Sequence, residues 1–139
     1  MAKILVVEAR FYEDLGERFY KNIKAELEKA KLQWEYICLA GALEVPGAIA
    51  YAANKGIYDG YLALGIIIRG DTIHYDIVCK QSARGLMDLS IHNELAIINA
   101  IQTVENKEQA LERIDSKAVH AVHALSQLLK AREQIEPSK

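Results

Sequence analysis

Residues 65–76, GIIIRGDTIHYD, run from three isoleucines into side chains that can do chemistry. Thr72 can offer its backbone N–H and its hydroxyl to an anion just before a helix, where the helix dipole favours negative charge. His74 carries an imidazole, a group that can accept and donate protons at neutral pH. Gly70 has no Cβ, so a ligand can approach the backbone closely there. The stretch therefore predicts an anion site with a proton-transfer group beside it.

These residues and two others also have purely structural interpretations. Thr72 could cap the following helix, Gly70 could serve a tight turn, and His74 could be an exposed loop histidine without a function. Phe11, in EARFY, either stacks on a flat ligand or covers the core. Glu44, in AGALEVPG, either accepts hydrogen bonds from a polyol or caps a helix.

The composition limits the classes of protein to which the chain can belong. Its 139 residues are 51% hydrophobic and 26% charged, which predicts a single globular domain over residues 1–139. The 17 basic and 19 acidic residues give a net charge of −2, which offers little attraction for nucleic acid. Cys38 and Cys79 lie in apolar segments and are predicted to be reduced core residues. We find no signal peptide and no run of about twenty apolar residues, so we expect a cytoplasmic protein without a membrane segment.

Short apolar runs alternate with amphipathic stretches along the chain. Strands are predicted at residues 3–8, 34–39, 61–68 and 95–101. Helices are predicted at residues 13–31, 46–55, 74–92, 107–114 and 117–132, with a break near Asp115 and Ser116, and residues 133–139 are expected to fray. The alternation predicts an α/β fold, because right-handed crossovers give a parallel sheet with helices on both faces.

Parallel sheets of this kind bind ligands beyond the carboxyl ends of their strands, where the winding reverses. The segments at those ends are residues 9–12, 40–45, 69–76 and 102–106, and they include the candidates above. The sequence contains no G-x-G-x-x-G after the first strand, no G-x-x-x-x-G-K-[ST] and no metal-ligand set. We therefore expect a small-molecule site that uses no dinucleotide, nucleoside triphosphate or metal.

Five motifs within residues 4–129 together resemble the 6,7-dimethyl-8-ribityllumazine synthase family: EARFY, GALEVPGAIA, LGIIIRGDTIHYD, SARGLMDL and TVENKEQALER. The resemblance implies a flavodoxin-like three-layer α/β/α sandwich with a four-stranded parallel sheet. It also implies a transferase of riboflavin biosynthesis that needs no cofactor. Such an enzyme condenses 5-amino-6-ribitylaminouracil with 3,4-dihydroxy-2-butanone 4-phosphate and releases phosphate and water. Its partners would be these two small molecules and other copies of the chain, in a homopentamer with active sites between subunits.

The same resemblance implies a role for each candidate residue. Phe11 would stack on the pyrimidine ring, and His74 would transfer protons. Other contacts to the pyrimidine substrate would come from Ala42, Leu43, Glu44, Ile66, Ile67, Ile68 and Asn99, and Lys117 would be a further substrate-binding residue. The phosphate would be held by Gly70, Asp71, Thr72 and Arg113. Asn99 and Arg113 would reach the site from a neighbouring subunit.

The chain departs from the family pattern in places. Ala40 stands where many members have proline, and Ala100 where they usually have glycine. After Arg113 many members have a longer glycine-rich loop with a substrate-binding lysine, whereas this chain has only IDSKAVHAV; Lys117 matches that lysine or an earlier one, depending on where gaps are placed. The alternative function is therefore a non-catalytic relative that binds flavin or lumazine. A flavodoxin-type electron carrier is disfavoured, because no Ser/Thr-rich phosphate loop follows the first strand.

Overall fold

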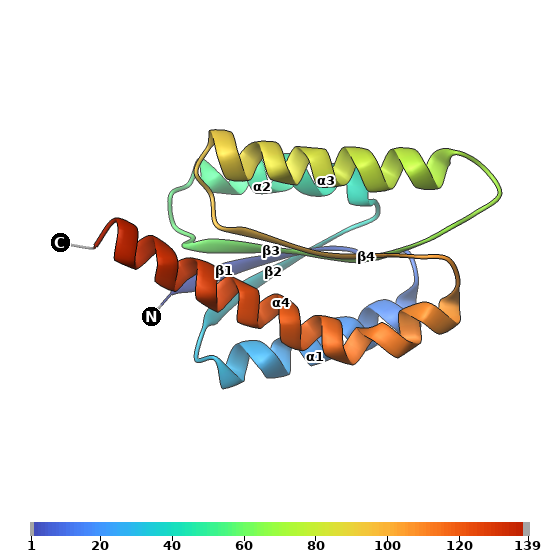
Figure 1. The fold of residues 1–139 in the computed structure, drawn as a ribbon, viewed down its shortest axis with the longest axis horizontal. Helices are drawn as coiled ribbons and strands as arrows, with labels where there is room; N and C mark the ends of the chain where they lie inside the picture. Colours follow the sequence, from blue (N-terminus) through green and yellow to red (C-terminus); the bar gives the residue numbers. More distant parts are fainter. Residues whose placement is uncertain (1, 138–139) are drawn as a thin grey trace.

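The computed structural model describes residues 2–137 and has three layers (Figure 1). The strands are β1 (Lys3–Ala9), β2 (Gln33–Leu39), β3 (Gly60–Ile68) and β4 (Ile97–Val104). The helices are α1 (Glu13–Lys29), the short 3₁₀ helix η1 (Ala42–Glu44), α2 (Val45–Ala53), α3 (His74–His92) and α4 (Lys107–Ile135). Helices α2 and α3 cover one face of the sheet, and α1 and α4 cover the other (Figure 1).

The four strands of the sheet are all parallel, in the order β2-β1-β3-β4. The chain moves from β1 to one edge of the sheet and then returns past β1 to build the other half, so the winding reverses between β1 and β3. This is the flavodoxin-like arrangement, and the predicted three-layer fold is confirmed. Ala9, the last residue of β1, pairs with Leu39 of β2 and with Gly65 of β3.

One apolar core lies on each face of the sheet and holds the layers together. Ile4 and Val6 of β1 face α1 and α4, whereas Leu5 and Val7 face α2 and α3. This alternation follows from the two-residue period of a strand. β3 lies between two other strands and is buried over most of its length, which explains why its sequence, GYLALGIII, contains no charged residue.

The predicted break near Asp115 and Ser116 is wrong, because α4 continues through both residues. The buried stripe of α4 passes from Ile114 to Ala118 without interruption, and the two polar residues lie on its exposed side. Asp115 accepts hydrogen bonds there from the side chains of Arg18 and Asn22 on α1. The helix ends at Ile135, inside the segment that we expected to fray; residues 138–139 of that segment lie outside the described part of the chain.

Two further sequence predictions are corrected by the sheet. β4 extends to Val104 rather than ending at residue 101, because pairing with β3 continues across the polar residues Gln102 and Thr103. Cys38 and Cys79 are free thiols but not core residues: Cys38 is exposed and Cys79 is half-buried. Cys38 lies on the edge strand β2, where no side chain is fully buried. None of the described helices has the length and apolar character needed to cross a membrane.

Gln102 places an amide inside the protein without hydrogen bonds. The residue is buried, and neither its side-chain oxygen nor its side-chain nitrogen has a partner among residues 2–137. Its neighbours two positions away, Ala100 and Val104, belong to the core beneath α1 and α4, so Gln102 points into the same core. A buried amide without partners carries the full cost of its lost hydration.

We therefore predict that Gln102→Leu raises the free energy of unfolding by about 1–2 kcal/mol, because an apolar side chain of similar size carries no such cost. Gln102→Glu is the matched control and should be destabilising, since it places a carboxylate in the same apolar position. Denaturant unfolding at a fixed protein concentration measures both changes. A clear loss of stability in Gln102→Leu would contradict the assignment of an unpaired amide.

Candidate active site

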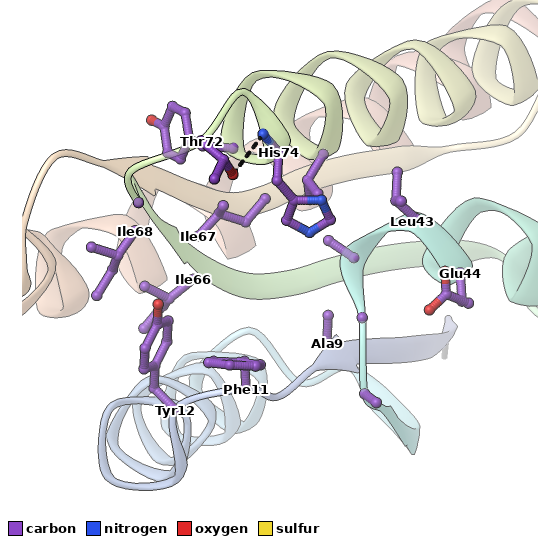
Figure 2. Close-up of a pocket in the computed structure, with 16 residues that line it drawn as sticks. Ala9, Phe11, Tyr12, Leu43, Glu44, Ile66, Ile67, Ile68, Thr72 and His74 are labelled. Carbon is purple, nitrogen blue, oxygen red and sulfur yellow. Dashed lines mark hydrogen bonds between the residues drawn. The ribbon is translucent and has the colours of Figure 1, made fainter.

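A pocket of about 310 Å³ lies at the carboxyl ends of β1 and β3, where the winding reverses (Figure 2). Three connections contribute to it: the β1–α1 turn, the segment from β2 into η1, and the β3–α3 loop. It is lined by Ala9, Phe11, Tyr12, Ala40, Gly41, Ala42, Leu43, Glu44, Ile66, Ile67, Ile68, Gly70, Thr72, His74, Tyr75 and Val78. A mostly apolar cavity with a few polar groups is typical of a site for a small organic ligand.

The β1–α1 turn supplies an aromatic wall. Phe11 follows β1 directly and its side chain is 77% exposed, so it does not cover the core. Its ring meets the edge of the Tyr12 ring with centroids 4.9 Å apart and planes at 74°. An exposed aromatic face beside a pocket is suited to stacking against a flat ligand. The stacking interpretation of Phe11 is thus the one that its surroundings favour.

The β3–α3 loop places a hydroxyl and an imidazole on the far side of the pocket from Phe11 (Figure 2). Thr72 lies just before α3, and its Oγ1 accepts a hydrogen bond of 3.2 Å from the backbone N–H of His74. The hydroxyl therefore serves the start of the helix and still keeps its own hydrogen for a ligand. The His74 side chain, on the first residue of α3, is exposed and reaches into the pocket.

Arg69, in the same loop, joins the loop to neighbouring elements. Its Nε donates to Glu105 at 2.6 Å, its Nη1 lies 3.6 Å from the Asp76 carboxylate, and its guanidinium lies over the Tyr75 ring. Glu105 directly follows β4, so this ion pair joins the loop to the end of the next strand. The Arg69 guanidinium is thus already paired with these neighbours, and Arg69 does not line the pocket.

The segment from β2 into η1 brings the carboxylate of Glu44 to the pocket, beside Ala42 and Leu43. The Glu44 carboxylate folds back over Gly41, where a Cβ would lie only 2.7 Å from its Oε1. A larger residue at position 41 would require the Glu44 side chain to move. The side chain of Glu44 makes no capping hydrogen bond to α2, which removes the structural alternative for this residue. Its oxygens are available to accept hydrogen bonds from ligand hydroxyls.

Among residues 2–137, no lysine or arginine lines the pocket, and the one carboxylate side chain that does is that of Glu44. Four predicted site residues lie outside its lining. Asp71 belongs to the β3–α3 loop, Asn99 lies on β4 in a separate hollow beside α3, and Arg113 and Lys117 lie on α4, which packs against the opposite face of the sheet. A single chain therefore gathers most of the predicted site but not its cations.

Arg113 is nevertheless distinguished by its surroundings. It is exposed, and among the described arginines it is the one whose guanidinium has no hydrogen bond or ion pair. The arginines with partners are Arg10, Arg18, Arg69, Arg84 and Arg132. Because α4 is continuous, Lys117 follows Arg113 by one turn of the same helix, and residues four apart share a face. The two cations form one basic group on the surface of α4.

A buried ion pair beneath Phe11 was not predicted from the sequence. Glu8, 1% exposed, ends the apolar run KILVVE, and its two oxygens accept from Arg10 Nε and Nη2 at 2.9 and 3.0 Å. The Tyr36 hydroxyl donates to the same carboxylate at 2.5 Å. The hydrogen bonds to Glu8 raise the pKa of Arg10 above its ordinary value. A carboxylate inside an otherwise apolar strand is the signal that could have identified this cluster.

Comparison with known proteins gives consistent matches over almost the whole chain. The model of the 6,7-dimethyl-8-ribityllumazine synthase family matches residues 1–133. A 6,7-dimethyl-8-ribityllumazine synthase of Novosphingobium aromaticivorans is 48% identical over 138 residues, covering 96% of this chain and 99% of that protein. The enzyme of the same name from Erythrobacter litoralis is 46% identical over 138 residues, with 96% and 98% covered. That from Bartonella tribocorum is 53% identical over 111 residues, with 79% and 74% covered.

The hydrogen bonds among Glu8, Arg10 and Tyr36 predict that loss of the Tyr36 hydroxyl lowers the stability of the protein. Tyr36→Phe should lower the free energy of unfolding at neutral pH by about 1–2 kcal/mol, because it leaves a buried carboxylate with one donor fewer. Tyr58→Phe is the matched control: Tyr58 also donates to a glutamate, Glu35, but that carboxylate is exposed. Its loss should cost clearly less stability than that of the Tyr36 hydroxyl, because water can replace the donor at an exposed carboxylate. Equal losses in the two variants would contradict the importance of burial.

Tyr36 should also make the stability of the protein depend on pH in the alkaline range. Burial, and then the hydrogen bond to Glu8, raise the pKa of the Tyr36 phenol. Because this pKa is higher in the folded chain than in the unfolded one, the stability that it contributes is complete below about pH 10 and is lost as the pH rises through the folded-state pKa. Tyr36→Phe should therefore show a shallower loss of stability above about pH 10 than the unchanged protein.

Proposed function

Because the chain belongs to the 6,7-dimethyl-8-ribityllumazine synthase family, we propose that its pocket binds 5-amino-6-ribitylaminouracil and 3,4-dihydroxy-2-butanone 4-phosphate together. The protein is an enzyme of the transferase class with lumazine synthase activity, which belongs to riboflavin biosynthesis. The assignment of the individual residues below is our proposal.

The pyrimidine substrate is placed between the aromatic and aliphatic walls of the pocket. Its ring stacks on Phe11, whose face is open to the pocket. Its ribityl chain extends toward η1, where Glu44 accepts hydrogen bonds from the hydroxyls and Ala42 and Leu43 line the wall. The end of β3 supplies backbone groups to the ring through Ile66, Ile67 and Ile68.

The phosphate of the second substrate binds at the start of α3. Thr72 donates its free hydroxyl hydrogen, and the backbone of Gly70, Asp71 and Thr72 surrounds the group near the positive end of the helix dipole. A phosphate monoester carries about −1.5 to −2 charges at neutral pH, and no lysine or arginine of the described part of the chain lines the pocket. The missing positive charge comes from Arg113 of a second copy, with Lys117 one turn further along the same helix.

His74 moves protons during the condensation. The amine of the pyrimidine attacks the ketone, and loss of one water gives an imine. The phosphate then leaves by elimination, and ring closure releases a second water. His74 reaches the pocket from the same loop as Thr72, so it can take a proton from carbon and return one to the leaving oxygens. Alignment of the two reactants contributes the larger part of the rate, up to about 7–11 kcal/mol in favourable cases.

The second copy joins through a contact between unlike surfaces. One chain contributes the pocket and the next contributes α4, and such head-to-tail contacts form rings, not two-fold dimers, when the rotation between copies closes. Exposed apolar residues along one side of α3, namely Ile77, Met87 and Ile91, offer a surface for this packing. We propose a homopentamer, the ring implied by the resemblance to the family. Asn99, exposed beside the hollow between α3 and β4, faces the neighbouring pyrimidine site in this arrangement.

The observation that carries this assignment is the composition of the pocket: an open aromatic face, an imidazole and a hydroxyl, without a cation to neutralise a phosphate. Substitutions of different site residues should therefore affect different kinetic constants and different substrates. His74→Ala should lower kcat by about 10- to 100-fold, because it removes proton transfer. Arg113→Ala should raise the KM for the butanone phosphate by about 10- to 100-fold, because it removes a charge-assisted hydrogen bond.

The assay follows the coloured product near the visible edge with each substrate varied in turn. Arg18→Ala is the control for Arg113→Ala, because Arg18 is also an exposed helical arginine but pairs only with Asp115; its kinetics should match those of the unchanged protein. Unchanged rates in both Thr72→Ala and His74→Ala would contradict the roles assigned to the β3–α3 loop.

A further inference from the structure

Phe11 has little packing of its own to hold it in place. Its side chain is 77% exposed, and its one aromatic contact is with the edge of the neighbouring Tyr12 ring. The position of the ring is therefore set mainly by the backbone of the turn between β1 and α1. A platform for a flat substrate must be held closely, because small displacements of the reactants lower the rate steeply.

Arg10 ties this turn to three elements at once. Its backbone N–H donates to the carbonyl of Leu39 at 2.9 Å, which extends the pairing of β1 with β2 by one residue. Its guanidinium holds both oxygens of Glu8 on β1, and its Nη1 reaches Glu17 on α1 at 2.9 Å. Strand β1 and the first turns of α1 are thus joined by one planar group, directly before Phe11.

The residues around the Glu8–Arg10 ion pair pack closely against it. Glu8 is buried and takes a third hydrogen bond from Tyr36 of β2. Gly16, in the first turns of α1, lies against the pair: a Cβ at this position would be 2.8 Å from Glu8 Oε2 and 2.9 Å from Arg10 Nε. A larger residue at this position would displace either α1 or the side chains of the ion pair. Buried ion pairs often add little net stability compared with apolar side chains, so the geometry that the pair imposes is its more distinctive property.

We propose that the Glu8–Arg10 ion pair is a positioning unit, which fixes the β1–α1 turn so that Phe11 presents its face to the pyrimidine substrate. The inference rests on the proposed role of Phe11 in the site. Neither Glu8 nor Arg10 lines the pocket, so both act through Phe11 and not by contact with substrate. The pair should therefore affect the pyrimidine substrate and leave the phosphate-bearing substrate almost untouched.

The direct test is the kinetics of Arg10→Lys. Lysine keeps the charge beside Glu8 but cannot make the two parallel hydrogen bonds to Glu8 together with the contact to Glu17. We expect kcat/KM for the pyrimidine to fall about 10- to 100-fold. The KM for the butanone phosphate should change by less than about twofold. Arg18→Lys is the matched control on α1, where an exposed arginine pairs with Asp115, and both constants should stay as in the unchanged protein.

A double-mutant cycle with Phe11→Ala separates positioning from general destabilisation. If Arg10 acts through Phe11, Arg10→Lys has no further effect on kcat/KM once the ring is absent. Additive losses in the double variant, or equal changes toward both substrates in the single variant, would overturn the proposal. Failure of the unchanged protein to turn over the two substrates would instead contradict the proposed function, so the two failures are distinguishable.

Glu17→Ala keeps the proposal testable if Arg10→Lys does not fold. Glu17 is largely exposed, so its loss leaves the buried pair intact and removes the shorter of the two links from Arg10 to α1; the other is a 3.5 Å contact with Glu13. We expect a smaller rise, of about two- to fivefold, in the KM for the pyrimidine alone, again absent in the Phe11→Ala background. An unchanged KM in Glu17→Ala, in folded protein, would overturn the link to α1.

Discussion

The reversal of winding between β1 and β3 places the ends of two neighbouring strands side by side while their helices leave toward opposite faces of the sheet. This constraint decides the rest of the site. It brings the turn that carries Phe11 and the loop that carries His74 to the two sides of one pocket, although more than sixty positions separate them in the sequence. The strands β1 and β3 are buried over most of their length between two apolar cores, which support the segments that carry the polar groups.

The two halves of this arrangement are stabilised by different means. On the β3 side, Arg69 joins the loop to the end of β4 and to the first turn of α3 through exposed ion pairs. On the β1 side, the turn depends on a buried carboxylate with three donors. The pocket between them contains no lysine or arginine, whereas the unpaired Arg113 lies on a helix at the other face of the same chain. Separation of the cation from the pocket is the physical reason to expect a site shared between copies.

Much of the fold and of the candidate site could be predicted from local sequence patterns, and the wrong predictions have physical causes that can be named. The apolar run at residues 61–68 and the change to polar residues after it predicted β3 and the loop correctly, and His74 in that loop lines the pocket. The break at Asp115 and Ser116 was predicted from polarity alone, but both residues lie outside the buried stripe and do not interrupt it. Glu8 was overlooked because a carboxylate in an apolar strand becomes interpretable only when its distant partner Tyr36 is seen beside it. Similarly, β4 continues through the polar residues Gln102 and Thr103, because its backbone pairs with β3 there.

The most direct test is complementation between two variants that are each impaired in activity. Chains with His74→Ala and chains with Arg113→Ala are unfolded together, mixed in equal amounts and reassembled. If each site combines the pocket of one chain with α4 of the next, about a quarter of the sites regain both residues, and activity rises well above that of either variant reassembled alone. If His74 and Arg113 act within one chain, no mixed ring contains a complete site. Activity that stays at the average of the two variants would then contradict the shared site.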